Sequence, residues 1–170
     1  MTVEQAFAGV AVKRLALLRD RILACLDKLD RDQIWMRGGE HENAVGNLIL
    51  HLCGNVRQWI GHGVGQLPDV RMRDREFATR GGMPVAELRE GLISTVDAAI
   101  GIIQEVEPVD LLRRFKVQEN DVTVLEAIFQ VTDHFSQHTG QIILLTKHAT
   151  GEDLGFYRHL SAASQGEKTP

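Results

Sequence analysis

The sequence predicts an all-α protein, most simply a four-helix bundle with an up-down arrangement and a long crossover loop between the second and third helices. Three observations support this fold class. Four long segments repeat apolar residues every three or four positions, which is the period of an amphipathic helix. Almost no segment alternates apolar and polar residues as a half-buried strand does. Glycine, proline and capping signals separate the four segments.

The first helix is predicted from Val3 to about Leu29. Leu15 and Ile22 lie on its apolar stripe, and Cys25 continues that stripe. A cysteine on the buried face of a helix behaves as a small apolar residue. We therefore expect Cys25 to be an inert, buried thiol rather than a nucleophile.

The second helix follows the polar link RGGEHEN, begins near Val45 and ends within residues 61–63. The next twenty residues, GVGQLPDVRMRDREFATRGG (63–82), combine glycine, proline and arginine and have no sustained period. They predict a long loop. Loops of this length in compact domains are often functional.

The third helix begins at Pro84, which suits a first helical position because its missing N–H would be unpaired there, and Pro108 ends it. An irregular connection, DLLRRFKVQENDV, follows. Thr123 and Glu126 then form a predicted capping box, which starts a fourth helix that extends to about Lys147.

The remaining sequence predicts one domain, residues 1–160, and a flexible C-terminal tail, residues 161–170. Within the domain, the segment ATGEDLGFYRHL is expected to fold back and bury Phe156 and Tyr157. The sequence shows no internal repeat and no domain linker.

Composition excludes several classes of partner. Asp and Glu number 23 against 19 Lys and Arg, so the net charge of -4 offers no basic field for nucleic acid or an anionic membrane. The N-terminus lacks the pattern of a signal peptide, and no run of 18 apolar residues is present. Two cysteines, Cys25 and Cys53, suit a reducing compartment. These features predict a cytoplasmic protein.

The stretch DHFSQHTGQI places His134 and His138 four positions apart on the fourth helix, on the same side as Val131 and Val124. Histidines at this spacing have Cβ atoms roughly 6 Å apart, so both rings can reach one divalent ion. Two neutral polar rings in a core are costly unless each finds a partner. A metal ion would satisfy both rings.

His51 is the candidate third ligand, because it lies beside the apolar stripe of the second helix. Three histidines from two facing helices form a site of the kind that helical bundles build in their interiors. Three protein ligands leave an open position, as in catalytic zinc sites. The alternative from spacing alone is that all three are packing histidines with ordinary hydrogen-bond partners.

Polar neighbours are expected to orient these imidazoles. Gln141 lies one turn after His138 and is the best candidate, and Asn55 and Gln130 are also within about a turn of a histidine. Asp133 and Gln137 are expected to be ordinary surface groups.

The two segments NAVGNLILHLCGNVRQWI and DHFSQHTGQI together resemble the DinB-like family of small bacterial four-helix-bundle metalloproteins. Members share one histidine on the second helix and an H-x-x-x-H pair on the last, followed by a small residue and GQ. The matching positions here are His51, His134 and His138, with Gly140 and Gln141 after them. The resemblance covers about residues 5–160 and is closest to an uncharacterised branch.

The resemblance implies a divalent metal ion, most often zinc or nickel, and frequently a homodimer. For some members it implies a transferase or isomerase that uses a low-molecular-weight thiol such as bacillithiol or mycothiol to attack a small electrophile. Other members have been described as metal-dependent hydrolases. The metal triad carries over to this chain, whereas the reaction does not.

Three functions therefore remain open. A thiol transferase would bind its thiol at the open metal position, and arginines of the long loop could bind the carboxylates of that thiol. These arginines are Arg71, Arg73, Arg75 and Arg80. A hydrolase would need a carboxylate base beside the metal, and only Glu42 or Asp133 could serve. The third function is a non-catalytic metal-binding or stress-response protein whose ion only ties two helices together.

Overall fold

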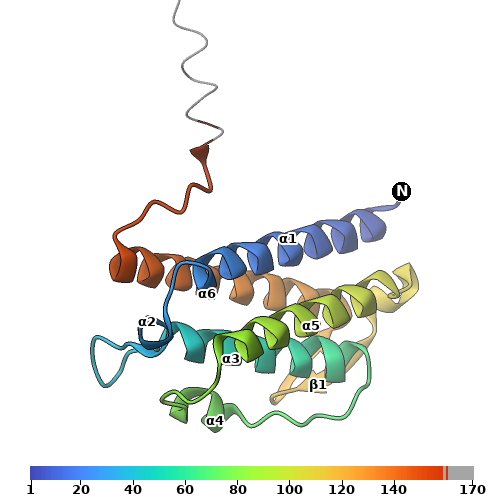
Figure 1. The fold of residues 1–170 in the computed structure, drawn as a ribbon. Coiled ribbons are helices and arrows are strands. Elements are labelled where there is room, and N and C mark those ends of the chain that lie inside the picture. The colour runs from blue at the N-terminus through green and yellow to red at the C-terminus, as the bar shows by residue number, and fades with distance from the viewer. Residues whose placement is uncertain (159, 161–170) are drawn as a thin grey trace, which may run out of the picture.

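The computed structural model describes residues 1–158 and 160, and this part of the chain is mostly helical (Figure 1). Its elements, in chain order, are α1 (Val3–Leu26), α2 (Arg31–Trp35), α3 (Val45–Val56), a π-helix η1 (Arg57–Val64), α4 (Arg73–Ala78), α5 (Val85–Gln104), a 3-10 helix η2 (Pro108–Leu112), β1 (Arg114–Val117), β2 (Asn120–Thr123) and α6 (Val124–Thr150). Among the described residues no helix is both long and apolar enough to cross a membrane.

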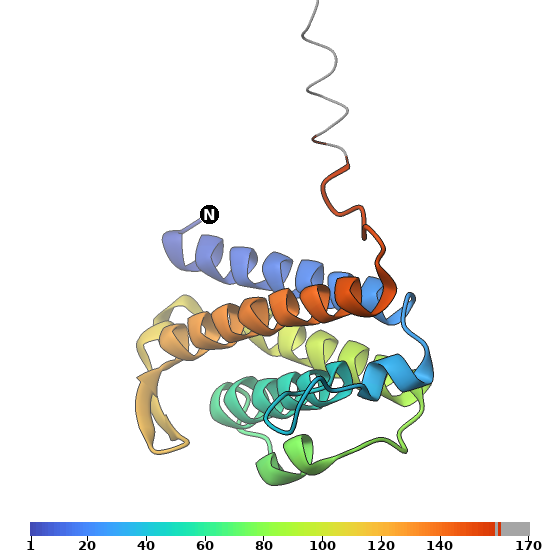
Figure 2. The same cartoon turned by 90° about the vertical axis from the view of Figure 1, so that its left-hand side faces the viewer.

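The four long helices enclose the core. In both views α1 and α6 form one layer and α3 and α5 form the other (Figures 1 and 2). Apolar stripes from all four meet between the layers, and Leu15, Leu52, Leu92 and Phe135 are fully buried there. Burial of this apolar surface is the main stabilising contribution.

Helix direction follows from side-chain pairs and from the crossover. Arg14 on α1 donates to Ser136 on α6, and Lys28 just after α1 pairs with Glu152 just after α6, so these two helices run parallel. The chain crosses over between α3 and α5, which therefore also point the same way (Figure 1). The predicted long connection between these two helices is present.

That connection is not entirely a loop, so the prediction was wrong for residues 73–78, which form α4. The helix has only six residues, too few to show a helical period in the sequence. It is held by contacts from α3 rather than by its own propensity, because isolated short helices are unstable in water.

A second correction concerns the connection before α6. Residues 114–117 and 120–123 form an antiparallel hairpin, in which Arg114 pairs with Thr123 and Val117 with Asn120. Its turn residues, Gln118 and Glu119, have φ angles of 48° and 64°. A turn of this kind favours Asn-Gly or Asp-Gly, so the hairpin lacks its usual sequence signal. The fold is thus helical with a small sheet rather than all-α.

The boundaries of the first and last helices differ slightly from expectation. α1 ends at Leu26, and Asp30 caps the separate helix α2 through a capping box with Gln33. The predicted capping box of α6 is present: the Thr123 hydroxyl accepts from Glu126 N at 3.1 Å, and Glu126 Oε2 accepts from Thr123 N at 2.7 Å.

Beyond α6, Gly151 ends the helix with a φ of 69°, a left-handed conformation that favours glycine. Phe156 is half-buried, but Tyr157 is 59% exposed, so the expected burial of Tyr157 was wrong. The Arg21 guanidinium lies 5.3 Å from the centre of each of these rings, a cation–π distance that a partly exposed ring can use. The expected flexible tail, residues 161–170, lies outside the described residues.

Candidate metal centre

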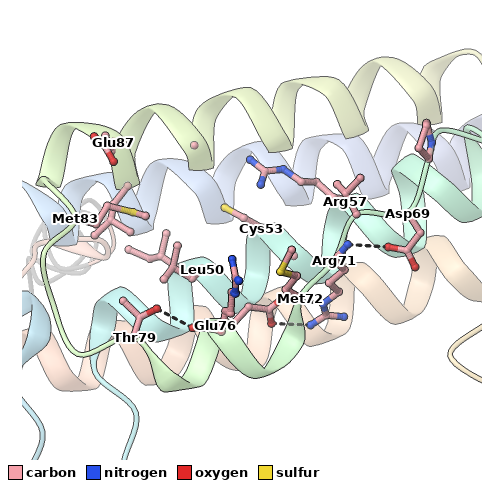
Figure 3. Close-up of a pocket in the computed structure, with 17 residues that line it drawn as sticks. Leu50, Cys53, Arg57, Asp69, Arg71, Met72, Glu76, Thr79, Met83 and Glu87 are labelled. Carbon is pink, nitrogen blue, oxygen red and sulfur yellow. Dashed lines mark hydrogen bonds and ion pairs between the residues drawn. The ribbon is translucent and has the colours of Figure 1, made fainter.

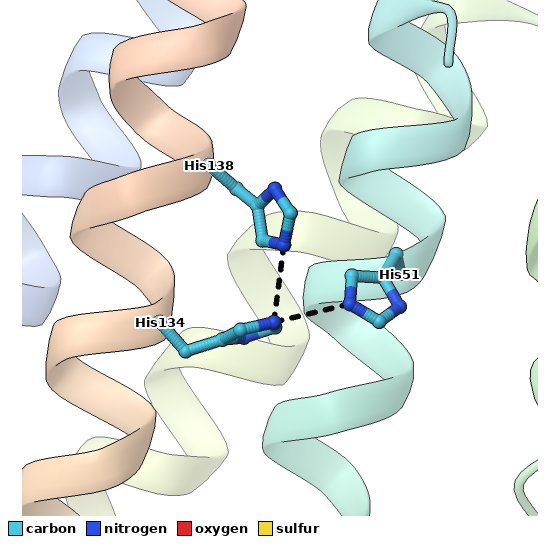
Figure 4. Close-up of side chains that lie close together, drawn as sticks. All are labelled: His51, His134 and His138. Atoms are coloured by element: carbon cyan, nitrogen blue, oxygen red, sulfur yellow. Dashed lines mark hydrogen bonds between the residues drawn. The ribbon is translucent and has the colours of Figure 1, made fainter. Parts of the chain in front are cut away.

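Three imidazole rings from two facing helices converge on one point (Figure 4). His51 comes from α3, and His134 and His138 come from successive turns of α6. The Nε2 atom of His134 lies 3.1 Å from Nε2 of His51 and 3.0 Å from Nε2 of His138. His51 is buried and the other two are half-buried. The cluster could hold a metal ion, as the spacing in the sequence predicted.

On α6, the outer nitrogen of His138 has a clear partner. Its Nδ1 atom lies 2.7 Å from Oε1 of Gln141, the residue three positions later on the same helix. An amide oxygen only accepts, so Nδ1 carries the hydrogen and Nε2 presents a lone pair. Gln141 therefore fixes both the orientation and the tautomer of His138.

His51 is fixed in the same way by a carboxylate. Its Nδ1 atom lies 2.9 Å from Oε2 of Glu76 on α4 and 3.2 Å from Nη2 of Arg71. The shorter contact is to an atom that can only accept, so Nδ1 carries the hydrogen; a lone pair there would repel the carboxylate oxygen. Nε2 of His51 then presents its lone pair to the cluster. Carboxylate–histidine pairs of this kind orient metal ligands and raise their basicity.

The donor set fits a divalent ion better than it fits mutual hydrogen bonding. With lone pairs on Nε2 of His51 and of His138, His134 can donate to only one of them, and one lone pair stays unmatched. Zinc–nitrogen bonds of about 2.0–2.1 Å in a tetrahedral site separate the nitrogens by about 3.3 Å, close to the spacing observed here. Three nitrogen ligands leave a position for a further ligand.

The environment also favours the neutral form of His134 and His138, the form that a metal ligand requires. Burial lowers the pKa of His134 to about 4, and the neighbouring His138 and His51 add to the effect. Burial also lowers the pKa of His138. The hydrogen bond to Gln141 raises it, but the effect of burial is larger. The Nδ1 atom of His134 is buried and has no hydrogen-bond partner within the described part of the chain.

Glu76 is itself held as an anion by Arg71. The Arg71 guanidinium donates Nε to Oε1 at 2.8 Å and Nη2 to Oε2 at 2.9 Å, a two-point ion pair. Burial tends to raise the pKa of Glu76, but hydrogen bonds from Arg71 and His51 outweigh burial and lower it. Arg71 Nη1 also donates to Gln58 on η1, and Gln58 accepts in turn from Gln118 at the hairpin tip.

Helix α4, which carries Glu76, is anchored on α3 by a fully buried amide. Asn47 Nδ2 donates to the carbonyl oxygens of Glu76 and Thr79, each at 2.9 Å. Arg37 donates to Asn47 Oδ1 at 2.6 Å and to the Phe77 carbonyl at 3.2 Å. These bonds satisfy backbone carbonyls at the end of α4 that would otherwise lack partners. They place the Glu76 side chain against His51.

Gly54 provides the space that the carboxylate occupies. A Cβ atom at this position would lie 1.9 Å from Oε1 of Glu76 and 2.7 Å from its Cδ. Gly54 is three residues after His51 on the same helix, so the absence of a side chain lets Glu76 cross α3 beside the histidine. Phe77, the next residue of α4, packs on the His51 ring at a centroid distance of 4.7 Å.

The residues proposed from the sequence to orient the histidines lie in different environments. Gln141 contacts His138, as described above. Asn55 is buried, but its Oδ1 atom has no partner among the described residues. Gln130 is exposed on α6. Asp133 accepts from Gln137 at 2.7 Å on the helix surface. Glu76 was missed, because it lies 25 positions from His51 in a segment expected to be a loop.

The four arginines of the crossover also lie in different surroundings. Arg71 is committed to Glu76 and its side chain is only 3% exposed, so it is not a free anion-binding group. Arg73 lies over the Phe77 ring, with its Cζ 5.0 Å from the centroid. Arg80 donates to the carbonyls of Phe77 and Thr79. Arg75 is exposed and borders a cavity between α4 and α5.

The comparisons with known proteins identify the family but attach no activity to it. No curated protein matches the chain. A family model described as "Protein of unknown function (DUF1572)" matches residues 2–165, nearly the whole chain. The chain, with its three-histidine cluster between two core helices, belongs to the DUF1572 family.

Proposed function

We propose that the protein is a DinB-like four-helix-bundle metalloprotein in which His51, His134 and His138 hold one divalent ion that activates a thiol. Imidazole ligands suit zinc and nickel, which are therefore the ions proposed. The observation that carries the proposal is the convergence of three Nε2 atoms whose rings are oriented by Glu76 and Gln141.

The ion would activate the thiol, and the side chains of the protein would hold the ligands of the ion in place. A divalent ion lowers the pKa of a coordinated thiol, so that thiolate is present at neutral pH. Glu76 and Gln141 keep the imidazoles in the ligating tautomer. Asn47 and Arg71 hold Glu76 in place, and Phe77 shields one face of His51 from water. The electrophile that the thiolate would attack would approach from the side of His134 and His138, the two half-buried histidines.

A hydrolase is supported less well, because the candidate carboxylates face other groups. The Glu42 carboxylate accepts from Gly38 N at 2.8 Å, and the Asp133 carboxylate accepts from Gln137. Glu76 lies on the Nδ1 side of His51, away from the point where the Nε2 atoms meet. A general base must reach the proton that it removes, and none of these three carboxylates points to the convergence of the nitrogens.

A purely structural metal site is the second candidate, since an ion would tie α3 to α6. A structural site is closed by a fourth protein ligand and is sealed from solvent. The cluster in the described residues contains only the three histidines, and two of them are half-buried. These features support access by a small ligand.

Whether a thiol can reach the ion distinguishes thiol activation from a purely structural metal site. The metal-free protein would be loaded with Co²⁺, whose visible absorption reports its ligands, and titrated with mercaptoethanol, with ethylene glycol as the matched control. A saturable sulfur-to-cobalt charge-transfer band, seen only with the thiol, is expected. A cobalt spectrum that does not change with the thiol would favour the structural site and contradict thiol activation.

A further inference from the structure

We propose that the cavity between α3, α4 and α5 binds a small monoanionic molecule with an apolar body, at a site separate from the metal centre. The cavity has a volume of about 430 Å³ and lies beneath the crossover segment (Figure 3). Small-molecule sites in proteins span about 300–1,000 Å³. None of the three histidines lines this cavity.

The cavity wall is mainly apolar. The apolar side chains that line it come from α3, the crossover and α5, and they include Leu50, Cys53, Met72, Met83 and Leu88. Methionine side chains adapt to irregular ligands, because they are unbranched and polarizable. Such a wall favours a hydrocarbon or aromatic body, and desolvating that body would drive binding.

Two cations at the cavity have no partner that neutralises them. Arg57 from η1 and Arg75 from α4 both line it and are exposed, and within the described residues neither guanidinium forms a hydrogen bond or an ion pair. The carboxylate of Asp69 also lines the cavity, but it accepts from Gln58 Nε2 and from Arg71 N. Arg71 also lines the cavity, but its charge is matched by Glu76. Apart from Glu87, the lining has three arginines, Arg57, Arg71 and Arg75, against two carboxylates, Asp69 and Glu76, which leaves one net positive charge for a single carboxylate head group to match.

A negative charge at the opposite end of the cavity restricts the ligand further. Glu87, in the first turn of α5, and Met83 lie at the end of the cavity away from Arg57 (Figure 3). Within the described residues the Glu87 carboxylate has no cationic partner, so it would repel a second negative group there. The complementary ligand therefore has one anionic head at the arginine end and an uncharged tail at the Met83 end.

The site adjoins the metal centre through one side chain. Glu76 lines the cavity and also accepts from His51. Arg71, its ion-pair partner, lines the cavity too. The Glu76–Arg71 pair is already almost fully shielded from water, so it forms a fixed part of the cavity wall. Ligand binding is nevertheless a property of the cavity itself and does not require a metal ion.

The test uses octanoate as the probe and octanol as its uncharged counterpart. Isothermal titration calorimetry on the full-length, chelator-treated protein would measure both affinities. We expect saturable binding of octanoate and at least tenfold weaker binding of octanol. Absence of saturable octanoate binding to the native protein would overturn the proposal. Equal binding of both probes would overturn the anionic assignment.

Two glycines of α5 provide a matched pair of variants. Gly91 lines the cavity, Gly101 does not, and a Cβ at either position would meet nothing within 4 Å. Gly91→Leu should fill the cavity and weaken octanoate binding at least tenfold, whereas Gly101→Leu should leave it unchanged. Unchanged binding in Gly91→Leu would place octanoate elsewhere and contradict the site.

The charge assignment has its own pair of variants. Arg57→Gln and Arg75→Gln should each weaken octanoate binding and leave octanol binding unchanged. Arg73→Gln is the control, because Arg73 lies on the same short helix as Arg75 but over the Phe77 ring. An Arg73→Gln effect as large as that of Arg75→Gln would indicate nonspecific charge attraction and overturn the assignment.

Discussion

The carboxylate of Glu76 occupies the space that a side chain at position 54 would fill, since a Cβ on Gly54 would lie 1.9 Å from its Oε1 atom. From this position Oε2 of Glu76 accepts the Nδ1 hydrogen of His51 at 2.9 Å. The orientation of one candidate metal ligand therefore depends on the absence of a side chain three residues later on the same helix.

Gly54→Ala should weaken metal binding without replacing a ligand. The atom in conflict with the new Cβ is the end of a flexible side chain, so Glu76 should move while α3 stays in place. Loss of a carboxylate that orients a ligating histidine typically costs about 10–100-fold in metal affinity. Competition with a chromophoric chelator would measure the change in zinc affinity.

Gly140→Ala is the matched control for this variant. Gly140 is on α6, beside the histidine pair in sequence, and a Cβ there would meet nothing within 4 Å. It should leave metal affinity unchanged and stabilise the helix by about 0.5–1 kcal/mol, because alanine restricts the unfolded chain more than glycine does. Equal loss of affinity in both variants would contradict the role given to Gly54.

Glu76→Gln should produce a similar loss of metal affinity, because the neutral amide is a weaker acceptor for the His51 hydrogen. Glu87→Gln is the control, since Glu87 lines the same cavity but does not contact a histidine. The double variant of Gly54→Ala with Glu76→Gln should be no worse than either single variant, because both remove the same hydrogen bond. Additive losses would show that the two residues act separately.

The metal-free protein should lose stability as the pH falls from about 6.5 to about 4. Burial, and then the neighbouring histidines, lower the pKa of His134 to about 4, and burial lowers that of His138. An unfolded histidine has a pKa of about 6.5, so between these values the unfolded chain binds protons that the folded protein excludes. The contribution of the neutral His134 ring to the free energy of unfolding is complete above about pH 6.5 and is lost as the pH falls toward 4.

Urea unfolding of the chelator-treated protein at several pH values would measure this dependence. His134→Gln should show a smaller loss of unfolding free energy across the same range, since glutamine does not titrate. A native protein whose stability is unchanged from pH 6.5 to pH 4.5 would contradict burial of the neutral histidines.

Both cysteines should resist alkylation in the folded protein at pH 8. Burial raises the pKa of Cys53 to about 11, and burial also raises that of Cys25. Because only the thiolate reacts, iodoacetamide labelling followed by mass spectrometry should modify neither residue in the time that labels the urea-unfolded chain. Rapid labelling of Cys53 would contradict the raised pKa of its thiol.

The sequence predicted the long helices and the histidine cluster because both depend on local period. His134 and His138 share a helix face through their four-residue spacing, and His51 lies beside a regular apolar stripe. Gln141 could be proposed for the same reason, since it is one turn from His138.

The parts that sequence reasoning missed depend on contacts between distant segments. Helix α4 is too short to show a period, and it is held by Asn47, whose role no local pattern indicates. The Glu76–His51 bond joins positions 25 residues apart through the space left by Gly54. The hairpin turn at Gln118 and Glu119 uses positive φ angles without glycine or asparagine.

The metal content of the purified protein is the decisive measurement for the three-histidine site. The native chain and the variants His51→Ala, His134→Ala and His138→Ala would be prepared without chelator or metal-binding tag and measured by elemental mass spectrometry. His62→Ala, which removes a histidine bonded to the Leu67 carbonyl outside the cluster, is the control. We predict about one equivalent of zinc or nickel in the native and His62→Ala proteins and its loss in the other three. A native protein that remains metal-free after addition of divalent ions would show that the three histidines do not form a metal site.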